Sequence, residues 1–134
     1  MLFTIAIIST AFLGLTTASP VSSNNRRYVA GTCGIHVTQY QKNENGVGGD
    51  YQYDIQIKDG VGAIIGGANH LPIPDLQSAT VDSELPFGLV VTSGAFDSDP
   101  VGFAYAGYIF SSSNGCSAGD YDNGARQMDC GFGC

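Results

Sequence analysis

Apolar and polar residues alternate without interruption over residues 51–58. One face of this segment carries Tyr51, Tyr53, Ile55 and Ile57, and the other carries Gln52, Asp54, Gln56 and Lys58. Alternation with a period of two predicts a half-buried antiparallel strand. Asp59-Gly60 follows and leads into the apolar run 61–65. An Asp-Gly pair between two strands predicts a hairpin with a type I′ turn.

The rest of the chain shows further short strand patterns separated by turn signals. We expect strands over residues 33–41, 87–92, 101–110 and 126–132, and a short edge strand over 80–85. Asn-Gly pairs at 45–46, 114–115 and 123–124 mark turns. Helical periodicity is weak, and its best window, 76–85, is interrupted by Ser, Thr and Val. The patterns predict a single-domain, all-β fold, which is either an antiparallel β-sandwich or a small barrel.

The N-terminal residues 1–18 have the pattern of a secretory signal peptide. The apolar run 2–15 is too short for a membrane-spanning helix, which needs about 20 apolar residues. Small residues follow it up to Ala18, after which we expect cleavage. No Lys or Arg precedes the apolar run, which departs from the usual pattern.

Residues 19–27 form a polar segment that ends in Arg26 and Arg27. Paired arginines after a polar spacer are typical of sites for furin- or kexin-like proteases, although they also occur as two solvated residues of a tail. A cut after Arg27 leaves a domain of residues 28–134. That domain keeps all 12 acidic residues and three basic ones, Lys42, Lys58 and Arg126.

Four cysteines follow the signal peptide: Cys33, Cys116, Cys130 and Cys134. An even number in a secreted chain predicts two disulfides, for which three pairings exist. If all four pair, at least one bridge must tie the start of the domain to its end. We favour Cys33–Cys134 with Cys116–Cys130 and leave the other pairings open. A zinc site is the competing interpretation, but it usually needs two close pairs, and the sequence has only Cys130 and Cys134.

The composition narrows the set of partners. The net charge is −7, only 13% of residues are charged, 43% are hydrophobic and 19 are glycines. Few charges with many apolar residues argue against disorder, and abundant glycine suits strands joined by tight turns. Nucleic acids and anionic membranes attract clustered Lys and Arg, which this chain lacks. We expect no nucleic-acid partner, no membrane insertion and a monomer.

Catalytic signals are sparse. The two histidines are His36, expected on the polar face of the first strand, and His70. The sequence has no G-x-S-x-G and no H-E-x-x-H motif. It also has no Trp, the ring on which sugars often stack, and most of its carboxylates fall in expected turns. We expect no enzymatic activity and no cofactor.

Two acidic clusters, Asp97–Asp99 and Asp120–Asp122, could offer oxygen ligands to calcium. A calcium loop of the EF-hand type that starts at Asp120 would need Glu at the position of Gly131. Turn chemistry is the favoured interpretation of both clusters, and we expect no metal.

Two segments are candidate binding loops. The first, residues 66–74, is rich in Gly and Pro and has Asn69, His70 and Leu71 at its centre, and the second carries Asp97 and Asp99. Binding residues concentrate on loops held by a scaffold, so we predict that these five residues contact a partner. The alternative is that 66–74 is only a crossover between two sheets. In that case the face carrying Gln52, Asp54 and Gln56 is the expected binding surface.

The signal peptide, Arg26-Arg27, the opening Cys33–Tyr40 and the ending Cys130–Cys134 together resemble a group of small secreted fungal proteins. In architecture the chain is also loosely similar to the fungal allergen and elicitor β-barrels, which are all-β with two disulfides. The resemblance implies a secreted effector or virulence-associated protein that binds a host protein or glycan without catalysis. An antimicrobial or killer-type toxin, or an inhibitor of a host hydrolase, is the alternative.

Overall fold

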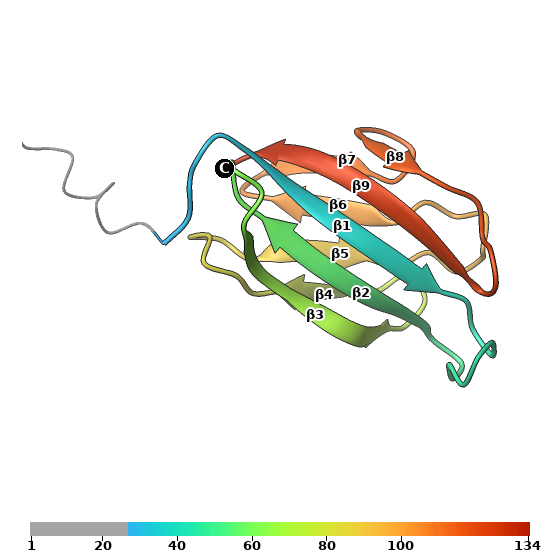
Figure 1. The fold of residues 1–134 in the computed structure, drawn as a ribbon. Helices are drawn as coiled ribbons and strands as arrows, with labels where there is room; N and C mark the ends of the chain where they lie inside the picture. Colours follow the sequence, from blue (N-terminus) through green and yellow to red (C-terminus); the bar gives the residue numbers. More distant parts are fainter. Residues whose placement is uncertain (1–26) are drawn as a thin grey trace, which may run out of the picture.

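A computed structural model describes residues 27–134, in which the chain forms nine strands and no helix. The strands are β1 (Thr32–Tyr40), β2 (Tyr51–Lys58), β3 (Ile64–Ile73), β4 (Ser78–Val81), β5 (Leu89–Thr92), β6 (Gly102–Tyr105), β7 (Tyr108–Ser111), β8 (Cys116–Ala118) and β9 (Ala125–Gly133). They form a five-stranded sheet, β3-β2-β1-β9-β8, and a four-stranded sheet, β4-β5-β6-β7. The two sheets face each other (Figure 1), so the β-sandwich is the observed one of the two predicted architectures.

The strongest sequence pattern is confirmed. Strand β2 has the predicted bounds, and its inward residues Tyr51, Tyr53, Ile55 and Ile57 are all buried. Strands β1 and β9 start and end within one residue of the predicted 33–41 and 126–132. They pair along their whole length at the centre of the large sheet. The core lies between these strands and the smaller sheet.

The predicted type I′ turn after β2 is wrong, although the hairpin itself is present. The loop is longer, because the Asp59 N–H donates to the Ala63 carbonyl at 2.9 Å. Gly60 does not take the positive φ that a type I′ turn needs, whereas Gly62 does. Gly60 instead lies against the N-terminal segment, where a Cβ would stand 2.6 Å from the Ala30 carbonyl oxygen. Contact with a distant segment therefore overrides the local turn preference.

The predicted loop 66–74 is also wrong, because residues 66–73 belong to β3 and only Pro74 lies in the connection that follows it. Strand β3 pairs with β2 through a bulge: Tyr53 faces Leu71 and Ile55 faces Ala68, so two residues of β3, Asn69 and His70, lie opposite one residue of β2. Next to the bulge only glycine fits at position 67, since a Cβ there would stand 2.0 Å from the Ile55 carbonyl oxygen. A bulged strand that needs Gly where it comes close to the neighbouring backbone has the same local composition as a loop. The sequence pattern therefore predicts a loop.

Three other predicted strands change their bounds. Residues 101–110 form two strands, because Ala106 and Gly107 both have positive φ and turn the chain in a two-residue hairpin. The strand expected over 87–92 begins only at Leu89, and the edge strand expected over 80–85 is β4, four residues from Ser78 to Val81. The structure adds β8, which no sequence pattern indicated.

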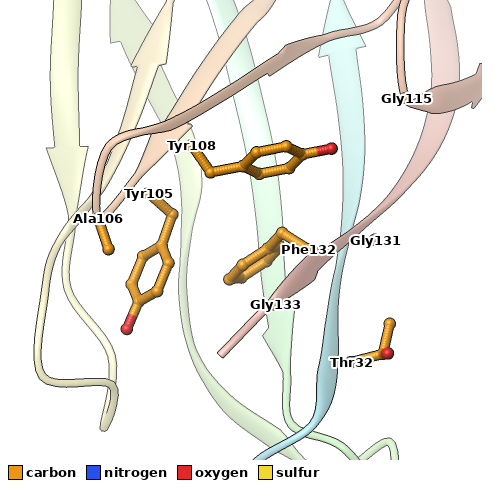
Figure 2. Close-up of a pocket in the computed structure, with 8 residues that line it drawn as sticks. All are labelled: Thr32, Tyr105, Ala106, Tyr108, Gly115, Gly131, Phe132 and Gly133. Atoms are coloured by element: carbon orange, nitrogen blue, oxygen red, sulfur yellow. The ribbon is translucent and has the colours of Figure 1, made fainter.

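One end of the sandwich is filled by aromatic rings. We call it the aromatic end, and its rings are those of Phe87, Phe103, Tyr105, Tyr108, Phe110 and Phe132. Phe110 is at the centre and stacks on Phe103, Tyr108 and Phe132 with ring centroids 5.2–5.7 Å apart. Figure 2 shows the rings of Tyr105, Tyr108 and Phe132 close to one another.

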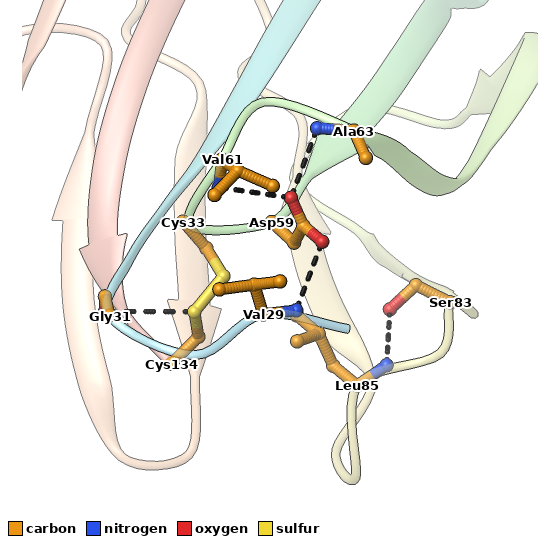
Figure 3. The surroundings of a disulfide bond; sticks show 9 residues. All are labelled: Val29, Gly31, Cys33, Asp59, Val61, Ala63, Ser83, Leu85 and Cys134. Carbon is orange, nitrogen blue, oxygen red and sulfur yellow. Dashed lines mark hydrogen bonds between the residues drawn. A yellow bond between two sulfur atoms is a disulfide. The ribbon is translucent and has the colours of Figure 1, made fainter. Parts of the chain in front are cut away.

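The favoured disulfide pairing is confirmed. Cys33–Cys134 joins β1 to the C-terminus across a sequence separation of 101, and Cys116–Cys130 joins β8 to β9 across 14. Beside the first bridge, the Asp59 carboxylate accepts hydrogen bonds from the N–H groups of Val29, Val61 and Ala63 (Figure 3). These bonds, above all that from Val29, hold the pKa of Asp59 below its usual value. The N-terminal segment is thereby fastened to the aromatic end.

The opposite end of the sandwich is held by polar side chains. We call it the loop end, and it consists of the connecting segments 41–50, 74–77, 93–101 and 119–124. Its buried centre is Gln39, which donates to the Tyr53 hydroxyl at 3.3 Å and accepts from Arg126 Nε at 2.7 Å. The Tyr53 hydroxyl also lies 2.8 Å from the buried Ser93 hydroxyl. This network links the two sheets where the aromatic rings do not reach.

Candidate functional site

The connecting segments of the loop end are fastened to one another. Asp97 accepts hydrogen bonds from the Tyr51 hydroxyl and from Gln41 Nε2, both at 2.7 Å. The Asn45 side chain donates to the Asn123 carbonyl, also at 2.7 Å. Segment 93–101 is thus fixed to 41–50 and to β2, and segment 41–50 to 119–124. The loops of the loop end are therefore hydrogen-bonded to one another and form one connected surface.

Asp99, the other acidic candidate, closes its own loop. Its Oδ2 accepts from the N–H groups of Ala95 and Phe96 at 2.8 and 3.0 Å, and its carbonyl accepts from Arg126. Both predicted acidic residues therefore have protein partners that shape the loop. The structure assigns Asp97 and Asp99 a positioning role, and their predicted contact with a partner stays a prediction.

Lys42 clamps two segments of the loop end together. Its Nζ lies 2.6 Å from Asp75 Oδ1, donates to the Ala95 carbonyl at 3.1 Å, and sits 4.7 Å from the centroid of the Tyr51 ring. The Lys42 side chain is 22% exposed, so this ammonium group is largely enclosed by its partners. Segments 74–77 and 93–101 are held at one fixed point.

A large exposed apolar residue follows each clamped residue directly. Leu76 comes after Asp75 and is 73% exposed, and Phe96 comes after Ala95 and is 70% exposed. Leu76 also has a φ of +60°, a backbone conformation that is costly for a branched side chain. Sequence reasoning missed both residues. The available signal was a Phe inside a run of turn-forming residues, 93–100, where nothing local calls for an aromatic ring.

The first predicted binding segment is on the outer face of the large sheet. The N–H of His70, in the bulge, donates to Asp54 Oδ1 at 2.7 Å, and its ring Nδ1 lies 3.1 Å from Gln52 Oε1. The His70 ring stacks on Tyr40 with centroids 4.7 Å apart, and the backbone of His70 has a φ of +48°. The predicted candidate His70 and the alternative face with Gln52 and Asp54 are therefore one surface.

The three residues of that segment differ in accessibility. Asn69 and His70 are exposed, whereas Leu71 is only partly exposed and packs against the core. Gln52, which contacts His70, and Tyr51, which contacts Asp97, are consecutive residues of β2 and point to opposite faces of the sheet. The two predicted binding segments are therefore on different sides of the large sheet.

The other histidine, His36, belongs to a separate group of hydrogen-bonded side chains on the same outer face of the large sheet. His36 Nδ1 lies 2.8 Å from Asp129 Oδ1, and its Nε2 lies 2.9 Å from Gln127 Oε1. Thr38 also donates to Gln127 Oε1, at 2.7 Å. Both ring nitrogens therefore face a carboxylate or an amide, and neither is hydrogen bonded to a hydroxyl or a thiol. As predicted, His36 lies on the polar face of the first strand.

A hydrogen bond couples Tyr40 to Asp54 beside His70, and that bond raises the pKa of Tyr40 above its usual value.

Across residues 27–134 no three His, Cys, Asp or Glu side chains are grouped so that they could hold a metal ion. In the same range, no helix has the length and apolar character needed to cross a membrane.

The proposed processing site is only partly within the described residues. Ala18 and Arg26 lie outside them. The Arg27 side chain is 82% exposed and 3.7 Å from Glu84. Two residues later the chain is fixed, because the Val29 carbonyl accepts from Gly60 N–H at 2.7 Å. Arg27 is thus accessible beside an anchored segment.

No family model, curated protein or solved structure that was compared with this chain matches it at a significant level.

Proposed function

We propose that this protein is a secreted, non-enzymatic effector that binds a host protein through its loop end. The observation that carries the proposal is the pair Leu76 and Phe96, two exposed apolar side chains on segments that Lys42 clamps together. Binding energy at protein interfaces concentrates in a few apolar or aromatic anchors, and rigid anchors lose little entropy on binding.

Other features support this setting. The two disulfides are compatible with an extracellular protein. The resemblance of the two cysteine-containing segments to small secreted fungal proteins suggests a host as the source of the partner. Asp75 precedes Leu76 and Asp97 follows Phe96 in the chain, so a partner with an apolar pocket and a basic rim would be complementary. An inhibitor of a host hydrolase would use this surface in the same way. A membrane-active toxin agrees less well with a net charge of −7.

The test compares matched surface variants of the secreted protein. Phe96→Ser and Leu76→Asn remove the anchors, and Asn tolerates positive φ at position 76. Ile109→Ser is the control, because Ile109 is 78% exposed on β7, outside the loop end. Each protein is immobilised and exposed to host extracellular fluid, and captured proteins are quantified by mass spectrometry.

We expect the wild type and Ile109→Ser to capture the same host protein, and the two loop variants to lose it by about tenfold or more, the size of an interface hot spot. Their effect in a host-response assay should fall in parallel, with unchanged circular dichroism. Full activity of the Phe96→Ser, Leu76→Asn double variant would remove the loop end as the binding surface. A further variant, Asn69→Ala with His70→Ala, would then test the outer face.

A further inference from the structure

The aromatic end contains a pocket that no part of the proposed function uses. It has a volume of about 530 Å³, within the range of small-molecule sites. Its walls are the start of β1, the hairpin between β6 and β7, the residue before β8, and the end of β9 (Figure 2). The lining residues are Thr32, Tyr105, Ala106, Tyr108, Gly115, Gly131, Phe132 and Gly133.

The pocket is open because β8 is shorter than β9. Pairing between them stops at Cys116 and Cys130, which leaves residues 131–133 of β9 without a neighbour on that side. Glycines keep the space free: a Cβ on Gly133 would meet no atom within 4 Å, and one on Gly131 would make only ordinary contacts. Neither glycine therefore adds a side chain to the lining.

The strand register also supplies hydrogen-bonding groups to this open edge. Gly31 and Cys134 exchange both backbone hydrogen bonds, at 3.2 and 3.0 Å. The next pair, Thr32 with Gly133, is therefore of the non-hydrogen-bonded kind. In such a pair the N–H and carbonyl groups point away from the paired strand, so those of Gly133 point toward the open edge.

The aromatic wall is preorganised. Tyr108 is 51% exposed, yet its ring is held by stacking on Phe110 at 5.2 Å and 26°. Tyr105 and Phe132 are buried and lie 5.0 Å apart. Figure 2 shows the three rings of Tyr105, Tyr108 and Phe132 grouped at one side of the pocket. A flat ligand therefore finds a fixed aromatic surface without ordering a mobile side chain.

The chemistry of the lining selects the ligand. None of the eight lining residues is charged, so the pocket offers no ion-pair partner to an anionic or cationic group. Aromatic faces stand beside uncharged hydrogen-bonding groups: the hydroxyls of Tyr108 and Thr32 and the backbone of Gly133. A purely apolar ligand would cover these polar groups without satisfying them, which costs free energy.

We propose that this pocket binds one neutral pyranose ring of a glycan. Such a ring has an apolar face of C–H groups to stack on Tyr108 and a rim of hydroxyls to bond the polar groups. The sequence has no Trp, and here tyrosine supplies the stacking ring. The site does not depend on the proposed loop-end function, because no residue is shared between them.

The test is a titration of the secreted, isotope-labelled protein followed by amide chemical shifts. The probes are chitotetraose, cellotetraose and laminaritetraose, with tetragalacturonate as an anionic probe and benzyl alcohol as an apolar one. We expect at least one neutral tetrasaccharide, at millimolar concentration, to shift the amide signals of Gly115, Gly131 and Gly133. Tetragalacturonate and benzyl alcohol should not shift them at the same concentration.

Four variants sharpen the test. Tyr108→Ala removes the stacking ring and Gly133→Val fills the pocket, and each should weaken binding by about tenfold or more. Tyr108→Phe keeps the ring but loses one hydroxyl, so it should weaken binding less than Tyr108→Ala does. Ile109→Ala lies on the same strand outside the pocket and should retain binding. The proposal is overturned if no neutral tetrasaccharide shifts these signals, if benzyl alcohol or tetragalacturonate binds as tightly, or if binding survives both Tyr108→Ala and Gly133→Val.

Discussion

The two ends of the sandwich join the same two sheets by different physical means. At the aromatic end, four buried rings fill the space between the sheets with two exposed rings packed beside them, and the Cys33–Cys134 bridge and Asp59 fasten the chain there. At the loop end, Gln39, Tyr53 and Arg126 form a hydrogen-bonded network, and side chains tie neighbouring loops together. One end depends on burial of apolar area and the other on matched polar partners.

This difference explains why each end suits a different kind of binding. Apolar packing has no strict direction, so the ring cluster can leave an open side at the pocket without an unsatisfied polar group. A buried polar network is stable only when each group has its partner, which fixes the loops above it. The loop end can therefore hold exposed side chains such as Leu76 and Phe96 in one place.

The largest expected effect comes from breaking the bridge of the aromatic end. Replacing Cys33 and Cys134 by Ser removes a loop closure across 101 residues, worth about 4.7 kcal/mol for a loop of this size. Replacing Cys116 and Cys130 by Ser opens a closure across only 14 residues, worth about 3 kcal/mol. Unfolding in urea should show the first double variant to be the less stable one.

The comparison of the two bridges is its own control, since each variant loses two cysteines. If both double variants lose the same free energy of unfolding, or if the Cys116–Cys130 variant loses more, chain entropy does not determine how much these two bridges stabilise the protein.

Next in size is the removal of the central ring of the aromatic end. Phe110→Ala should lower the free energy of unfolding by about 3–5 kcal/mol, because Phe110 is buried and stacks on three other rings. Ile109→Ala, next to it but 78% exposed, should change it by less than about 0.5 kcal/mol. Thermal and urea unfolding measure both. A loss at Phe110 no larger than that at Ile109 would contradict the view that these rings form this end of the core.

A smaller loss is expected from the corresponding change at the loop end. Gln39→Leu leaves Arg126 Nε and the Tyr53 hydroxyl short of a partner, and should cost about 1–3 kcal/mol. Arg126→Met should cost a similar amount. The double variant should cost less than the two single losses together, because both ends of one hydrogen bond are then apolar. Additive losses in urea unfolding would show that the Gln39–Arg126 bond does not couple the two residues.

The sequence predicted the elements whose signal is local. The alternation over 51–58 gave β2 with its bounds, and the segregation of Cys33 from the other cysteines pointed to the long bridge. The hairpin at Ala106-Gly107 and the bulge in β3 were missed, because turns and bulges draw on the same small residues as loops. The sequence did not reveal that Asp99 closes its own loop, because its hydrogen bonds to Ala95 and Phe96 depend on the folded loop.

The candidate site was less predictable than the fold. Lys42 meets the Ala95 carbonyl across 53 positions of sequence, and no local pattern records such a contact. The exposure of Leu76 and Phe96 likewise follows from the positions of the loops. The pocket arises from a mismatch in length between β8 and β9, and β8 had no sequence signal. Long-range side-chain contacts, and strand lengths that depend on the partner strand, are properties of the tertiary structure. A local sequence pattern therefore does not predict them.

The smallest effect concerns the buried tyrosines of the loop end and is measured through the pH dependence of stability. The Tyr121 hydroxyl is buried near Arg126 and has no hydrogen-bond partner among residues 27–134. Burial raises the pKa of Tyr121 to about 12, and that of Tyr53 to about 12 as well. An unfolded tyrosine has a pKa of about 10. The folded state therefore keeps protons that the unfolded state releases, so stability is complete below about pH 10 and falls between about pH 10 and 12.

Tyr121→Phe isolates this contribution. At pH 7 the variant should be as stable as the wild type or more stable by up to about 1 kcal/mol, since it removes a buried polar group that makes no hydrogen bond. Above about pH 10 its stability should fall less steeply, because one tyrosine with a raised pKa is gone. Tyr53→Phe is the matched comparison: it also removes a raised pKa, but it loses the hydrogen bonds to Gln39 and Ser93 and should be less stable at pH 7. Urea unfolding from pH 7 to 12 measures both variants. An alkaline fall as steep in Tyr121→Phe as in the wild type would mean that this hydroxyl is already solvated in the folded protein, and that the loop end is less tightly closed than its contacts indicate.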